Sequence, residues 1–163
     1  MKKTFLIPLL IFSFGLMMPK AQLTAHTLIN VGYTYQNHNF GEVGGRLLLL
    51  SNDDVIYRVG ASALFGSSTG DLKVLPKVQG DILFNFEKGV DFYHSYYFLL
   101  GAEATTKYIA PKAGISLFGL LDLTGGYGFS LDSEGIGGKP LEGLNIGVSL
   151  NLPVVMLVDL FKK

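Results

Sequence analysis

Residues 144–152 read LNIGVSLNL, the most regular alternation in the chain. Every second residue is leucine, isoleucine or valine, and asparagine, glycine and serine stand between them. Successive side chains of a β-strand point to opposite faces, so this period of two predicts a strand with one apolar and one small polar face. Such a strand suits a sheet whose two faces meet different surroundings.

The same period recurs in seven more segments. They span residues 29–35, 43–49, 57–65, 78–86, 96–104, 109–117 and 121–129. Most are near the length of about 9–11 residues that a tilted membrane strand needs. The chain has 163 residues, 21 glycines and no tryptophan, and we predict one all-β domain of about eight antiparallel strands.

The distribution of charge over the two faces separates two kinds of barrel. The apolar faces are large, aromatic and almost free of charge, whereas the opposite faces carry small polar residues and nearly all the strand charges. A soluble barrel has an apolar interior and a charged exterior, and a membrane barrel reverses this. Small residues also suit a narrow interior, so we predict an antiparallel up-and-down transmembrane barrel.

The lengths of the predicted connections support this interpretation in part. The second, fourth and sixth connections, at residues 51–54, 87–89 and 118–120, are short, as periplasmic turns of membrane barrels are. The third and seventh, residues 66–73 and 131–141, are the longest and are rich in glycine and serine, whereas the first and fifth are short. The positions of the short and long connections predict that the odd-numbered connections are outer loops and that both termini lie on the periplasmic side.

The beginning of the chain has the three parts of a secretory signal. Two lysines precede an apolar run over residues 5–18, and a short exit follows. We predict a signal peptide over residues 1–21, cleavage after Ala21 and a barrel domain over residues 22–163; an uncleaved anchor is the alternative. Loss of three lysines would leave 10 Lys and Arg against 13 Asp and Glu, and this balance does not favour nucleic acid.

Over residues 24–152 the pattern resembles the small outer-membrane β-barrel proteins of the OmpA-transmembrane and OmpX-like group. The resemblance implies a monomeric integral protein of the cell outer membrane, surrounded by outer-membrane lipids and inserted by the barrel insertion machinery. It also implies a non-enzymatic structural or surface-interaction role. The chain departs from the group after Pro153, where residues 154–163 replace a terminal aromatic residue. We expect this tail to be a bent continuation of the last strand or a short periplasmic segment.

The predicted inward faces carry seven charged residues of both signs. They are Glu42, Arg46, Arg58, Asp81, Glu103, Lys112 and Asp122. Enclosed charges are costly unless they are paired, so we predict a hydrogen-bonded ion-pair network along the barrel axis. A gated ion path is the alternative, but eight strands leave an interior that side chains fill, so an open porin is not expected.

Aromatic residues near the strand ends share the parity of the apolar faces. They include Tyr33, Tyr35, Phe65, Phe84, Phe86, Tyr96, Tyr127 and Phe129. We predict that these rings form girdles at the two membrane interfaces. The alternative is a soluble periplasmic barrel that binds an apolar ligand, in which the face with Leu144 and Ile146 would point inward.

Signals for catalysis and for metal or cofactor binding are weak. Outer-membrane enzymes that modify lipid A use a histidine with a serine and a carboxylate, but adjacent residues such as His94 and Ser95 point to opposite faces of a strand. His38 lies in an outer loop with no evident partners, and residues 135–140 depart from a phosphate-binding loop. The chain has no cysteine and only three scattered histidines. We predict no enzyme, no metal and no cofactor, with a lipid-modifying enzyme as the alternative.

Overall fold

The structure, a computed structural model, describes residues 24–50, 54–68, 70–87 and 96–161, which form eight strands and one helix. The strands are β1 (Thr24–Gln36), β2 (Asn39–Leu50), β3 (Val55–Ser68), β4 (Asp71–Asn85), β5 (Tyr96–Thr105), β6 (Tyr108–Leu117), β7 (Leu121–Ser130) and β8 (Gly143–Pro153), and the helix is α2 (Val154–Phe161). The predicted signal peptide and its cleavage site lie outside the described residues, as do His94 and Ser95.

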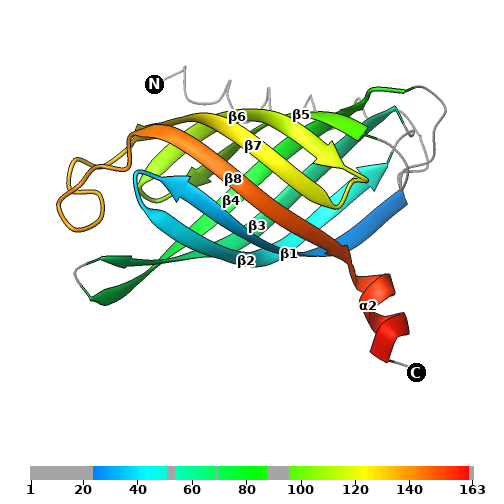
Figure 1. The fold of residues 1–163 in the computed structure, drawn as a ribbon, viewed down its shortest axis with the longest axis horizontal. Coiled ribbons are helices and arrows are strands. Elements are labelled where there is room, and N and C mark those ends of the chain that lie inside the picture. Colours follow the sequence, from blue (N-terminus) through cyan, green and yellow to red (C-terminus); the bar gives the residue numbers. More distant parts are fainter. Residues whose placement is uncertain (1–23, 51–53, 69, 88–95, 162–163) are drawn as a thin grey trace, which may run out of the picture.

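The strands close into a barrel in the order of the chain. Each strand pairs antiparallel with the next, and β1 pairs with β8, where Val31 lies opposite Leu150. Figure 1 shows the strands inclined to the long axis, with the β7–β8 loop and the β3–β4 hairpin at one end and α2 at the other. The predicted all-β fold, an antiparallel up-and-down barrel of eight strands, is confirmed.

The alternation along each strand determines which side chains point into the barrel. In β8, Leu144 and Ile146 are 58% and 41% exposed, whereas Asn145 and Asn151 are 1% and 0% exposed. A register shift of one residue would exchange these two faces, so the pairing and the polarity pattern specify each other. The apolar face of β8 points outward, which is opposite to the orientation that a barrel with an apolar ligand inside requires.

The third connection is shorter than predicted, because β3 and β4 continue through most of residues 66–73. Gly66 pairs with Lys73, and the ladder ends at Ser68 and Asp71. The prediction of a long loop here is wrong. Glycine and serine are common in loops by composition, but they also pair normally when both strands continue. The result is a hairpin that extends beyond the barrel wall, at the left of Figure 1.

Two other connections also test the sequence interpretation. Residues 118–120 form the predicted short turn between β6 and β7, and the long seventh connection, residues 131–141, lies between β7 and β8. The predicted short turn at residues 87–89 falls on the stretch that begins at residue 88 and lies outside the described residues.

The tail after β8 is a helix, so the prediction of a bent continuation of the last strand is wrong. Pro153 is the last residue of β8 and pairs with Leu28. On the other side β7 begins at Leu121, opposite Leu150, so a longer β8 would have an unpaired edge. A helix forms its backbone hydrogen bonds internally and avoids this edge. No helix among the described residues is long and apolar enough to cross a membrane.

Candidate functional site

The seven charged residues that the alternation assigns to the inward faces are all buried inside the barrel. Their exposed fractions range from 1% for Arg58 to 7% for Lys112. Six consecutive strands supply them: Glu42 and Arg46 on β2, Arg58 on β3, Asp81 on β4, Glu103 on β5, Lys112 on β6 and Asp122 on β7. The barrel therefore brings together charges that lie up to 80 residues apart, from residue 42 to residue 122.

One half of this site is an arginine cluster formed by Arg46, Arg58, Asp81 and Asp122. Arg58 Nη2 donates hydrogen bonds to Asp122 Oδ2 over 2.7 Å and to Asp81 Oδ2 over 3.3 Å. Arg46 Nη1 donates to the same oxygen of Asp122 over 2.8 Å, and Asn151 Nδ2 donates to it over 2.9 Å. These charge-assisted bonds compensate both guanidinium groups for the loss of water.

The other half is a lysine cluster formed by Glu42, Lys77, Glu103 and Lys112. Lys77 Nζ lies 2.5 Å from Glu42 Oε2 and 3.2 Å from Glu103 Oε2. Lys112 Nζ lies 3.3 Å from Glu103 Oε2, and the Tyr108 hydroxyl donates to Glu103 Oε1 over 2.8 Å. Glu103 thus has two cations on one carboxylate oxygen and two neutral donors, Tyr108 and Asn145, on the other.

Lys77 completes the network, although the sequence analysis did not include it. Two contacts join the clusters: Lys112 to Asp81 over 3.6 Å and Arg46 to Glu42 over 3.9 Å. With Lys77, which is 2% exposed, the buried set contains four cations and four anions and has no net charge. Two signals in the sequence point to Lys77: it shares the parity of Asp81 on β4, and the seven predicted residues sum to a charge of −1.

Inward glycines make room for the long charged side chains. A Cβ atom at Gly60 would lie 2.8 Å from Arg46 Cγ, and a Cβ at Gly101 would overlap the Asp81 side chain. Outward glycines behave differently, because a Cβ at Gly80 would have nothing within 4 Å. The small residues predicted for a narrow interior therefore stand where the ion pairs need space.

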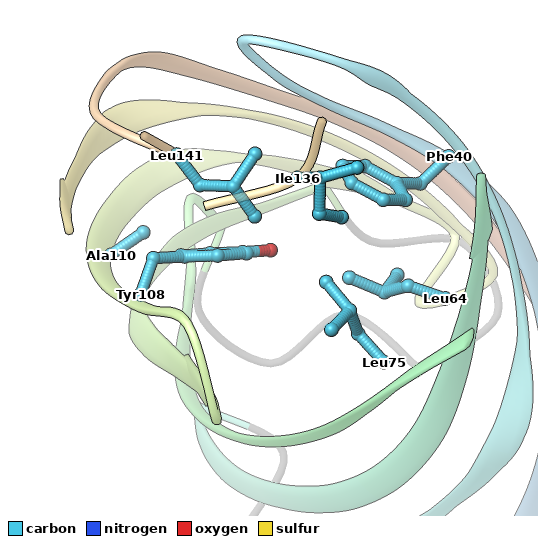
Figure 2. Packing of buried hydrophobic residues seen from close by; sticks show 7 residues of the cluster. All are labelled: Phe40, Leu64, Leu75, Tyr108, Ala110, Ile136 and Leu141. Atoms are coloured by element: carbon cyan, nitrogen blue, oxygen red, sulfur yellow. The ribbon is translucent and has the colours of Figure 1, made fainter. Parts of the chain in front are cut away.

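Apolar clusters lie toward both ends of the interior, beyond the charged residues. The loop-end cluster consists of Phe40, Leu64, Leu75, Tyr108, Ala110, Ile136 and Leu141. Ile136 and Leu141 belong to the β7–β8 loop, and Figure 2 shows Ile136 between Tyr108 on one wall and Phe40 on the other. The opposite-end cluster consists of Leu28, Leu48, Ile56, Leu83 and Tyr97, with Leu50 packed against it.

These two clusters enclose the ion pairs in the middle of the barrel. Most of their members occupy inward positions near strand ends, at the same parity as the charged residues, so strand parity was the signal that could have found them. Ile136 and Leu141 follow no such period because they come from a loop. The arrangement holds charges in fixed pairs and separates them from both ends with apolar side chains.

The outer surface of the barrel is covered by apolar side chains, in contrast to the charged middle of the interior. Its exposed aromatic side chains form one group toward the loop end, Tyr33, Phe65, Tyr127 and Phe129, and another toward the α2 end, Tyr57, Phe84, Phe86, Tyr96, Phe98 and Phe118. Phe84 lies opposite Phe98 across β4 and β5, and the rings of Tyr96 and Phe118 are 5.3 Å apart. Aliphatic side chains such as Val59 and Leu100 cover the surface between the groups and are 47% and 42% exposed.

An exposed ion pair lies at the loop end of the barrel. Lys107, between β5 and β6, pairs with Asp132 of the β7–β8 loop, and the two side chains are 29% and 31% exposed. The amide of Glu134 donates to Asp132 Oδ1 over 2.9 Å. The hydrogen bond from Lys107, followed by the one from Glu134, lowers the pKa of the Asp132 carboxyl below its usual value.

Of the residues considered for catalysis, the structure describes His38 but not His94 or Ser95. The ring of His38 lies 6.4 Å from that of Phe40, and its buried Nδ1 has no hydrogen-bond partner. The glycine-rich segment of the β7–β8 loop forms a turn closed by Ile136 and Lys139. Within the described ranges no group of three or more His, Asp or Glu residues is arranged to hold a metal ion.

Comparison with known proteins gives no match to this chain, whether with family models, curated proteins or solved structures. Two features of the barrel therefore bear on its function: a neutral network of ion pairs inside, and an apolar surface with two aromatic groups outside.

Proposed function

We propose that the chain is an integral outer-membrane β-barrel protein with a non-enzymatic structural or surface-interaction role. One observation carries this proposal: the strands turn large apolar side chains outward and keep the charged ones inside. Val59 and Val78 are 47% and 59% exposed, whereas Arg58 and Lys77, next to them in sequence, are 1% and 2% exposed. A surface of this kind is unfavourable in water and favourable in contact with lipid.

The height of the apolar surface agrees with a bilayer. Tyr57 and Phe65 lie eight positions apart on β3, one in each aromatic group. This separation corresponds to about 26 Å along the strand and to about 20 Å along the axis at a strand tilt of about 40°. The apolar band of outer-membrane barrels is about 25 Å tall and is bordered by aromatic rings at both interfaces.

The interior supports a closed barrel over an ion-conducting one. A water-filled path would cross both apolar clusters, and the charges between them are already paired with one another. The barrel then serves as an anchor, and the parts that reach the exterior are the β3–β4 hairpin and the β7–β8 loop. The protein inserts as a monomer with the help of the barrel insertion machinery.

Fractionation combined with gel mobility tests this proposal. The full chain, produced in a bacterium with two membranes, should sediment with the outer membrane and resist extraction by carbonate. In detergent, the unheated protein should migrate differently from the boiled protein, because a closed barrel stays folded. Recovery as a soluble periplasmic protein, or the same mobility before and after boiling, would overturn the proposal.

A further inference from the structure

Helix α2 has an exposed apolar surface that its position in the fold leaves uncovered. Val155, Met156 and Val158 are 66%, 52% and 43% exposed, and Asp159, the only charged residue of the helix, is exposed beside Val155 and Met156. Val154 and Leu157 are half-buried. An isolated helix of eight residues is marginal in water, so α2 needs an apolar surface for its stability.

The direction of α2 indicates what covers this surface. Figure 1 shows the helix leaving the end of β8 sideways, outside the outline of the barrel, instead of lying across its open end. The helix follows β8 directly. Leu150, near the end of β8, is 41% exposed on the outward face of that strand. The exposed residues of α2 therefore continue the apolar surface of the barrel at the end where Tyr57, Phe84 and Tyr96 lie.

We propose that α2 is an interfacial helix that lies in the phospholipid layer beside this end of the barrel, roughly in the membrane plane. Val155, Met156 and Val158 insert at the boundary between head groups and acyl chains. The helix is about 12 Å long, and apolar helix faces of this type enter that boundary by about 5–10 Å. In the sequence Lys162 and Lys163 follow, and ammonium groups suit the phosphates of the head groups.

This inference rests on the proposed function, because it takes the outer surface of the barrel to be in contact with lipid. It adds a second kind of membrane contact, made by a helix in the interface and not by strands through the bilayer. A second copy of the chain or a partner protein could cover α2 instead, and the experiment below separates these outcomes.

Site-specific fluorescence measures the contact directly, since the chain has no cysteine of its own. Single variants Met156→Cys and Val158→Cys, labelled with an environment-sensitive dye, are folded into vesicles of phosphatidylcholine and phosphatidylglycerol. Brominated phosphatidylcholine is then the quencher. Val148→Cys, on the outward face of β8, reports lipid contact of the barrel, and Ser133→Cys, in the β7–β8 loop, is the matched control for an exposed site.

We expect brominated lipid to reduce the emission at positions 156, 158 and 148 and to leave position 133 unchanged. Loss of emission at position 148 without loss at 156 and 158 would reject the interfacial helix and keep the membrane barrel. A blue shift at 156 and 158 without quenching would also reject it, in favour of a protein contact. No quenching at position 148, in a barrel that still shows heat-dependent gel mobility, would reject the proposed function itself.

Discussion

Arg58 and Val59 are neighbours in β3, yet they lie in opposite environments. Arg58 is 1% exposed and pairs with Asp81 and Asp122, whereas Val59 is 47% exposed on the outer surface. The backbone of the two residues belongs to the same ladder, so the difference arises only from the face on which each side chain lies. The comparison teaches that the middle of this barrel carries its charges inside and its apolar side chains outside, which is the reverse of a soluble protein.

The largest effect is expected at the inner residue of this pair. Arg58→Ala leaves Asp81 and Asp122 with less compensation in a closed interior, and loss of a buried charge partner costs about 3–5 kcal/mol. The measurement is the free energy of unfolding in urea, with the protein in vesicles. Val59→Ala is the matched control and should cost about 1 kcal/mol or less. Similar losses for both variants would remove the contrast between the two faces.

A charge on the outer face sharpens the comparison. Val59→Arg should lower the free energy of unfolding in vesicles by about 1–3 kcal/mol, because it places a cation inside the apolar band, between the interface at Tyr57 and the midplane. Leu72→Arg is the control: Leu72 is 69% exposed on the hairpin beyond the band, and its replacement should cost about 0–1 kcal/mol. If water surrounds the barrel, both variants will be equally mild.

Substitutions at two glycines, one on each face, compare the two faces with the smallest possible change in side-chain size. Gly101→Ala adds a methyl group where the Asp81 side chain and the carbonyl of Gly80 already lie, and overpacking of this kind costs about 1–3 kcal/mol. Gly80→Ala adds the same group on the outer face, where nothing lies within 4 Å, and should change stability little or raise it slightly. The measurement is the free energy of unfolding of each variant in urea. Equal losses would mean that the interior is not tightly packed.

The smallest effect is expected for the exposed pair of Lys107 and Asp132. The pKa of Asp132 is lowered in the folded loop. The contribution of the pair to the stability of the loop is therefore fully present above about pH 4, and it is lost as the pH falls through the lowered pKa. Hydrogen exchange of the Glu134 amide should lose less than about tenfold in protection over this range. Asp132→Asn should remove the pH dependence, and a variant that keeps it would show that another group titrates.

Parity along the strands was sufficient to predict the barrel and the inward position of its charges. The strand around Arg58 and Val59 illustrates this, since small or polar residues alternate with apolar ones from Tyr57 to Ser62. Parity does not specify the height of a side chain along the barrel, because height depends on the stagger between strands. For this reason the sequence predicted a network but not its division into an arginine cluster and a lysine cluster.

Other features depended on contacts between distant segments. Ile136 enters the barrel from a loop, where no period marks a buried position. Valine-rich residues 154–158 favour a strand by local preference, but β7 gives them no partner, and they form a helix. Lys77 is predictable from its parity on β4 together with the charge of −1 that the other seven inward residues leave unbalanced.

The ion pairs also have a consequence for the lifetime of the folded barrel. Arg46 and Arg58 meet Asp122 across 76 and 64 residues of chain, so these bonds form only when β7 approaches β2 and β3 inside a nearly closed sheet. Interactions that form after the rate-limiting step of folding act mainly on the unfolding rate. The network should therefore slow the unfolding of the barrel strongly and change its folding rate little.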